Sequence, residues 1–176
     1  MKKAIKMMMF VAAAAMLFVA CDKEDEKPVT AGDNQMIYDG HTYELDRVSS
    51  SMEGNGVQFS CSKFGEAFIF EIDGFIDNLT ASHTYDLTKV DNDHSLYFRI
   101  FLQSEDLSAE NHIFDLRYQN APELWYFLDD NEVSGASAFT KGTAVANIEA
   151  NKLTLDVYGT LVNGKSISFR IVAPID

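Results

Sequence analysis

The stretch KLTLDVYGTLVNGKSISFRI, residues 152–171, decides the fold because its apolar residues alternate with polar ones. Alternation with a period of two indicates two β-strands, each with one buried face. A two-residue loop at Asn163-Gly164 would pair the apolar face of one strand with the polar face of the other. A three-residue loop, residues 162–164, instead sets Val157 opposite Phe169, apolar against apolar. The stretch therefore predicts an antiparallel hairpin with this longer loop.

A second hairpin is predicted immediately upstream. A two-residue loop at Ala150-Asn151 places Glu149 opposite Lys152 and Ala146 opposite Leu155. Opposite charges are then paired, and the apolar faces of the two strands coincide. Small residues then occupy the inner face of the first strand: Gly142, Ala144 and Ala146. Small inner residues leave space for large side chains from across the core, and they also help a sheet to curl.

Further strands follow from the same alternation. Asp39-Gly40 tolerates the positive φ angles of a two-residue turn, and apolar residues alternate on both sides of it. Residues 68–72 and 96–102 alternate over longer runs and are predicted to be central strands. A short helical turn is predicted at residues 106–111, where the alternation stops.

These elements predict an all-β protein with a single domain over residues 35–176. Many short strands joined by short turns fit either an antiparallel β-barrel-like domain or a two-sheet β-sandwich. The inner-face glycine and alanine residues of the last meander favour barrel-like closure.

The N-terminus has the layout of a secretory signal peptide. Lys2, Lys3 and Lys6 precede an apolar stretch over residues 7–20. A helix of that length rises about 21 Å, which is short of the ~30 Å hydrocarbon core of a bilayer. We therefore expect residues 1–20 to be removed rather than to remain as a membrane span.

The sequence LFVAC, residues 17–21, resembles the lipobox of bacterial lipoproteins, in which the cysteine becomes the lipidated N-terminus. The acidic run DKEDEKP, residues 22–28, resembles the export signal of surface lipoproteins in the Bacteroidetes. The resemblance implies that Cys21 carries lipid such as palmitate and that residues 21–34 form a flexible tether. It also implies an outer-membrane protein exposed at the cell surface, with the periplasmic face as the alternative.

The formal net charge of the chain is −13. Removal of the leader takes away three lysines and no acidic residue, which moves this charge to −16. Such a surface repels phosphate, so nucleic acid and anionic lipid are excluded as direct partners, and membrane attachment depends on the lipid.

The cysteine and histidine residues indicate neither a reactive thiol nor a metal site. With Cys21 lipidated, Cys61 is the only thiol, and its alternation with Val57 and Phe59 predicts a packing role. The four histidines lack the short fixed spacings of zinc sites: His41, His83, His94 and His112. We therefore expect no metal site built on histidine.

Two acidic clusters and one aromatic cluster are the candidate ligand sites. Residues 91–93 and 129–132 are rich in Asp and Asn and offer oxygen ligands for calcium, although both lack the pattern of an EF-hand loop. Trp125 and Phe127 are predicted on one face of a strand and Tyr126 on the other. We take as candidate ligand-binding residues Trp125, Tyr126, Asp129 and Asp130.

Three classes of function follow from these features. A non-catalytic module that binds a glycan or another nutrient ligand is the leading hypothesis. The alternative is a structural or assembly lipoprotein that binds another envelope protein through an exposed sheet edge. An enzyme is the least favoured class, because Asp129, Asp130 and Glu132 have no identified catalytic counterpart. No cofactor is predicted.

Overall fold

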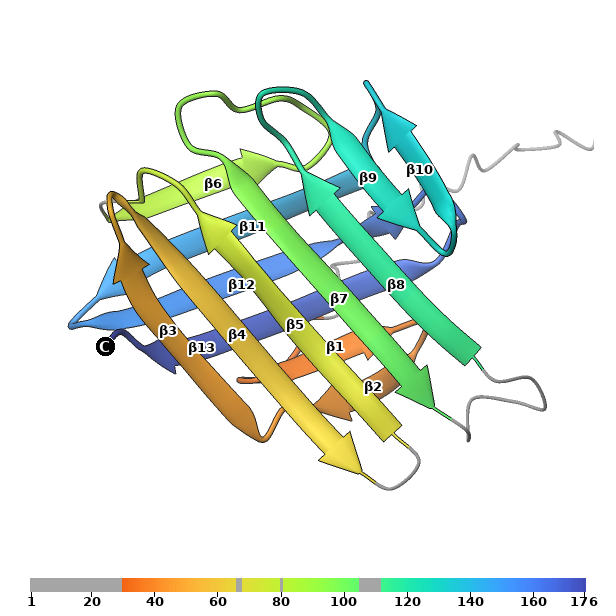
Figure 1. Cartoon of the computed structure of the whole chain (residues 1–176), viewed down its shortest axis with the longest axis horizontal. Coiled ribbons are helices and arrows are strands. Elements are labelled where there is room, and N and C mark those ends of the chain that lie inside the picture. The colour runs from red at the N-terminus through yellow and green to blue at the C-terminus, as the bar shows by residue number, and fades with distance from the viewer. Residues whose placement is uncertain (1–29, 66–67, 80, 105–111) are drawn as a thin grey trace, which may run out of the picture.

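The computed structural model describes residues 30–65, 68–79, 81–104 and 112–176. Thirteen β-strands in these residues form two antiparallel sheets that lie face to face (Figure 1). The six-stranded sheet contains, in spatial order, β2 (His41–Glu44), β1 (Gln35–Tyr38), β13 (Ser166–Pro174), β12 (Lys152–Leu161), β11 (Phe139–Glu149) and β6 (Ser82–Asp86). The seven-stranded sheet contains β10 (Asn131–Ser134), β9 (Trp125–Leu128), β8 (His112–Gln119), β7 (Leu96–Ser104), β5 (Phe68–Ile76), β4 (Gly56–Gly65) and β3 (Arg47–Glu53).

The architecture is a two-sheet sandwich, and the expectation of barrel-like closure is wrong. Small residues on the inner face of β11 and β12 make room for side chains instead of curling the sheet. A Cβ atom added to Gly142 would lie 3.0 Å from Phe139 Cδ1 and 3.1 Å from Leu87 Cδ1. A Cβ atom added to Gly159 would lie 2.7 Å from the same Phe139 atom. The glycines therefore let Phe139 cover one end of the core.

The predicted hairpins are confirmed in register and in turn geometry. Val157 pairs with Phe169 across β12 and β13, and Gly164 has the positive φ of 83° that the three-residue loop requires. Ala146 pairs with Leu155 across β11 and β12, and Ala150 and Asn151 both have positive φ. The predicted central strands are β5 and β7, which lie inside the seven-stranded sheet. The predicted helical turn at residues 106–111 lies outside the described residues.

The core lies between the two sheets and is rich in aromatic rings. Phe98 of β7 is fully buried, and its ring centroid lies 5.1 Å from that of Tyr118 and 5.4 Å from that of Phe169. Phe169 belongs to the six-stranded sheet, so this contact joins the two layers. Cys61 is buried in the same core, as predicted.

The last residues of the chain link the two sheets at one corner. Ser50 of β3 forms an isolated parallel bridge with Ile175, which follows β13. The Ser50 hydroxyl donates to the Pro174 carbonyl oxygen at 2.7 Å, and the Asp176 N–H donates to the Ser50 carbonyl oxygen at 3.0 Å. Strand β13 also pairs with β1, so the C-terminal strand holds the N-terminal one.

Candidate ligand-binding face

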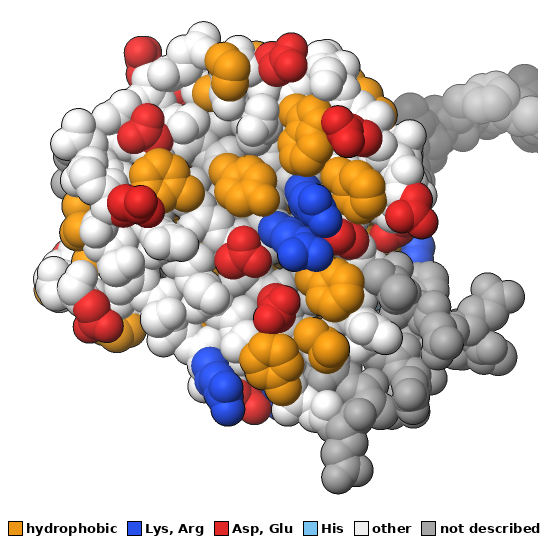
Figure 2. All heavy atoms as spheres, in the orientation of Figure 1, with side chains coloured by type: hydrophobic (Ala, Val, Ile, Leu, Met, Phe, Trp, Pro, Cys, Tyr) orange, Lys and Arg blue, Asp and Glu red, His pale blue; other side chains and the backbone are white. Residues whose placement is uncertain are grey.

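The outer face of the seven-stranded sheet carries aromatic and charged side chains. This sheet is the front layer in Figure 1, and Figure 2 shows hydrophobic side chains spread over it with basic and acidic side chains between them. Most inner residues of β4, β5, β7, β8 and β9 are buried, so strand alternation directs the other half of the side chains of these strands to the outer face.

Three aromatic residues lie in one cross-strand row on this face. Phe75 of β5 pairs with Tyr97 of β7, Tyr97 pairs with Gln119 of β8, and Gln119 pairs with Trp125 of β9. Gln58 of β4 pairs with Phe75 and, together with Gln119, gives the row two amide side chains. All three aromatic side chains are partly exposed. We call Phe75, Tyr97 and Trp125 the aromatic row; directly paired side chains are about 5 Å apart at Cβ.

A charged cluster lies beside the aromatic row. Arg99 donates from Nε and Nη2 to the two carboxylate oxygens of Asp115, at 3.1 Å each. Arg117 Nη2 donates to Asp115 Oδ2, also at 3.1 Å. The Arg99 guanidinium lies 5.2 Å from the ring centroid of Phe101, and that of Arg117 lies 4.9 Å from the ring centroid of Phe127. Such cation–π contacts attract each guanidinium to its neighbouring ring.

The pKa values of two carboxyl groups on this face shift in opposite directions. Burial raises the pKa of Asp115, but the hydrogen bonds from Arg99 and Arg117 outweigh it, so the pKa lies below its ordinary value. Burial raises the pKa of Asp73 above its ordinary value, and nearby Arg99 only partly offsets this. In the described part of the chain, no group donates a hydrogen bond to the Asp73 carboxylate.

Asp73 lines a shallow hollow at one end of the aromatic row. The hollow has a volume of about 140 Å³. Its lining residues combine aromatic rings, carboxylates and an amide: Glu53, Gln58, Asp73, Gly74, Phe75 and Tyr97. This volume is below the roughly 300 Å³ of a pocket for a whole small molecule, so the hollow has room for one chemical group of a larger ligand.

The structure separates the four candidate residues chosen from the sequence. Trp125 lies on the outer face, where Nε1 donates to Glu132 Oε1 at 3.4 Å. Tyr126 points into the core with only 6% of its surface exposed, because strand alternation turns it away from Trp125. Asp129 and Asp130 form the turn between β9 and β10, with φ angles of 44° and 67°.

Phe75, Tyr97 and Gln119 are further residues of the outer face that were not predicted from the sequence as candidates. Each lies at an outward position of a strand whose inward positions are apolar, which is the signal that could have identified it. Their position in one row depends on the pairing of β5, β7, β8 and β9, and no local pattern encodes that order.

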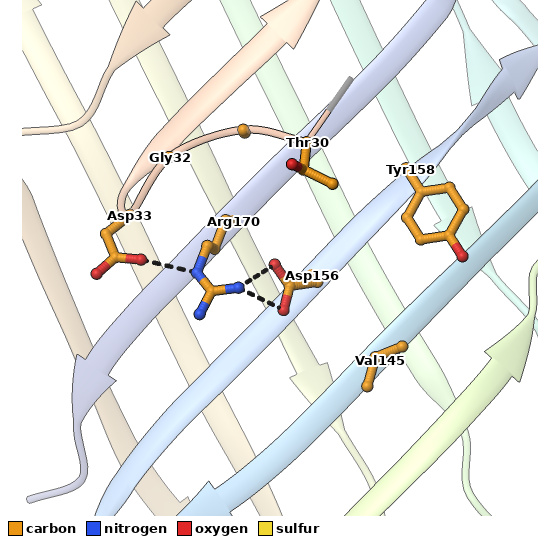
Figure 3. Close-up of a pocket in the computed structure, with 8 residues that line it drawn as sticks. Thr30, Gly32, Asp33, Val145, Asp156, Tyr158 and Arg170 are labelled. Atoms are coloured by element: carbon orange, nitrogen blue, oxygen red, sulfur yellow. Dashed lines mark hydrogen bonds and ion pairs between the residues drawn. The ribbon is translucent and has the colours of Figure 1, made fainter. Parts of the chain in front are cut away.

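A second and larger hollow, of about 420 Å³, lies on the outer face of the six-stranded sheet. Figure 3 shows Arg170 between Asp33 and Asp156, with Val145 and Tyr158 farther along the neighbouring strands. Arg170 Nε donates to Asp33 Oδ1 at 2.7 Å, and Nη1 donates to both Asp156 oxygens at 2.8 and 2.9 Å. The guanidinium is thus satisfied by two carboxylates, and it fastens the chain ahead of β1 to β13.

The other residues considered as candidate sites make contacts that stabilise the fold. The Asp91 carboxylate accepts the N–H groups of Asp93 and His94 and lies 2.8 Å from His83 Nε2, so it organises its own loop. Burial raises the pKa of the Cys61 thiol to about 12.

The described residues contain no group of three or more His, Cys, Asp or Glu side chains arranged to hold a metal ion, which gives the calcium alternative no support.

In the portion of the chain covered by the structure, no helix has the length and apolar character needed to cross a membrane. Comparisons of the chain with protein-family models, with curated proteins and with solved structures gave no match.

Proposed function

We propose that this protein is a non-catalytic binding module of the bacterial envelope that holds glycans on its aromatic row. The observation that carries the proposal is the register that sets Phe75, Tyr97 and Trp125 in one line across four strands. We further propose that Cys21 carries the lipid that anchors the module in the outer membrane, with the folded domain at the cell surface.

Glycan chemistry fits this face. A pyranose ring has a flat face of C–H groups, which packs on an aromatic ring, and a rim of hydroxyls, which need hydrogen-bond partners. The aromatic row supplies rings, while Gln58 and Gln119 supply amides that both donate and accept. A β-sheet holds these groups rigidly, so binding orders few side chains.

The position of the N-terminal segment is consistent with an aromatic row that faces away from the membrane. Residues 30–33 line the hollow on the outer face of the six-stranded sheet, and Asp33 is bonded there to Arg170. A tether that precedes residue 30 therefore joins the domain on the sheet opposite the aromatic row. An anchor on that side leaves the aromatic row directed away from the point of attachment.

Thermal shift and calorimetric titration of the purified protein with a panel of plant and host oligosaccharides test the proposal. A bound glycan raises the melting temperature because it binds the folded state. Trp125→Ala and Tyr97→Ala should each weaken binding by about tenfold, equivalent to about 1.4 kcal/mol. Tyr158→Ala removes a partly exposed aromatic side chain from the opposite sheet and is the matched control. Failure of every glycan to bind, or loss of binding only in Tyr158→Ala, would contradict the proposal.

A protein partner is the second candidate, and one observation favours it. Arg99 and Arg117 lie against Phe101 and Phe127, and arginine and aromatic residues are the types enriched at the centres of protein interfaces. This alternative predicts that no glycan binds and that one envelope protein cross-links to the wild type but not to Trp125→Ala.

A further inference from the structure

The hollow beside the aromatic row has a chemistry that the row as a whole lacks. It brings two carboxylates, Glu53 and Asp73, together with the aromatic rings of Phe75 and Tyr97. Aromatic rings and carboxylates in one small space are the groups that attract an ammonium ion, since both present negative charge to it. A neutral hydroxyl donates hydrogen bonds to carboxylates, but it gains no comparable attraction from the rings.

The Asp73 carboxylate can accept hydrogen bonds for which the described residues supply no donor. Arg99 lies directly opposite it in the β5–β7 pair, but both of its bonded nitrogens are directed to Asp115. Arg117 is also bonded to Asp115. Among the described residues none donates to Asp73, so this half-buried group retains its full acceptor capacity toward a ligand.

The balance of charge around the hollow is negative despite the two arginines. The carboxylates that line or adjoin it belong to Glu53, Glu71, Asp73 and Asp115, whereas the basic groups that act on Asp73 are those of Arg99 and Arg117. The four carboxylates outnumber the two guanidinium groups, and Asp115, which is bonded to both of them, offsets one of their two positive charges. A cation that enters the hollow therefore meets uncompensated negative charge.

We propose that the hollow binds the protonated amine of an amino sugar, so that the aromatic row takes sugar rings while Asp73 selects for a free amino group. This inference rests on the proposed function and narrows its ligand class. The volume of about 140 Å³ is enough for an ammonium group and the carbon that carries it, while the rest of the glycan lies along the row.

Titration of the purified full-length protein with three oligosaccharides of equal length tests the inference. The probes are chitosan oligosaccharides, which carry protonated amines, chitin oligosaccharides, in which these amines are acetylated, and cello-oligosaccharides, which carry hydroxyls only. The wild type should bind the chitosan probe about tenfold more tightly than the other two, and rising salt should reduce the difference.

Asp73→Asn is the decisive variant because it removes the charge and keeps the shape. It should bind all three probes with equal affinity, at the level that the wild type shows for the neutral ones. Glu149→Gln loses one negative charge from the end of β11, in the other sheet, and should retain the preference. Equal binding of the three probes by the wild type, or a preference that survives in Asp73→Asn, would overturn the inference and leave the proposed function intact. Failure of the wild type to bind any glycan would instead overturn the proposed function, and the inference with it.

Discussion

Asp73 lies directly opposite Arg99 in the β5–β7 pair, yet the Arg99 guanidinium binds the two oxygens of Asp115 at 3.1 Å each. The sheet therefore contains one carboxyl group that burial holds above its ordinary pKa and a second that two arginines hold below it. These opposite shifts predict opposite dependences of stability on pH.

Asp73→Asn should stabilise the protein near neutral pH. Because the pKa of Asp73 is higher in the folded state than in the unfolded state, its contribution to stability is full below the unfolded value of 3.8 and is lost as pH rises through the folded value. Asparagine resembles the protonated form at every pH. The urea midpoint of the variant should exceed that of the wild type at about pH 7, and the difference should vanish at about pH 3. A difference independent of pH would show that the cause is not ionisation.

Asp115→Asn should destabilise the protein by about 1 kcal/mol at neutral pH, because Arg99 and Arg117 lose their common charged acceptor on a partly exposed face. The pKa of Asp115 is lowered in the folded state, so its contribution is present above the unfolded value of 3.8 and is lost as pH falls through the folded value. Denaturation curves at several pH values should show the cost of this substitution shrinking in acid, the reverse of the behaviour at Asp73.

Phe98→Ala should cost about 3–5 kcal/mol of unfolding free energy, because the ring is fully buried and contacts rings of both sheets. Phe64→Ala removes the same side chain from β4 at a position that is 53% exposed, and it should change stability by no more than about 0.5 kcal/mol. Urea unfolding of both variants measures the contrast. Equal losses would mean that Phe98 is not central to the core.

Cys61 should not react with a thiol reagent while the protein is folded. The side chain is buried, and burial raises the pKa of its thiol to about 12, so thiolate is scarce at pH about 8. A colorimetric thiol assay of the mature protein should detect no reactive group in the native state and one after unfolding in urea. A fast-reacting thiol in the native protein would show that Cys21 is not lipidated or that Cys61 is accessible.

Cys21→Ser should abolish lipid attachment and membrane association together. The leader and the lipobox-like residues make Cys21 the proposed acceptor, and the acidic net charge of the chain disfavours direct binding to an anionic membrane surface. Metabolic labelling with a fatty acid, followed by separation of membrane and soluble fractions, measures both effects. Retention of the label in Cys21→Ser would locate the lipid elsewhere.

The turns and their registers could be predicted from the sequence because their determinants are local. Asp39-Gly40 and Ala150-Asn151 adopt the positive φ angles of two-residue turns, and the apolar pattern on either side of each turn leaves one register that buries the apolar face. The acidic pair Asp129-Asp130 also has positive φ at both residues, so the sequence that was considered for calcium serves as a hairpin turn.

The order of strands and the proposed binding face could not be predicted, because both depend on contacts between distant segments. Strand β6 pairs with β11, and β1 pairs with β13, across intervals that no turn or periodicity records. Trp125 is a candidate in the sequence because aromatic residues surround it, and its neighbour Tyr126, a candidate for the same reason, is buried. Phe75 and Tyr97 belong with Trp125 only once the seven-stranded sheet has assembled.

The pairing of β1 with β13 has a consequence for the order in which the molecule is made. Among the described strands, β1 and β2 are synthesised before the others, but they can join the six-stranded sheet only through β13, which is synthesised after the other twelve. The link between the two sheets at Ser50 also depends on Ile175 and Asp176. A topology with such distant pairings folds slowly, because β1 must wait for β13. That delay suits a polypeptide that must thread through a translocation channel as an extended chain, as the proposed leader requires.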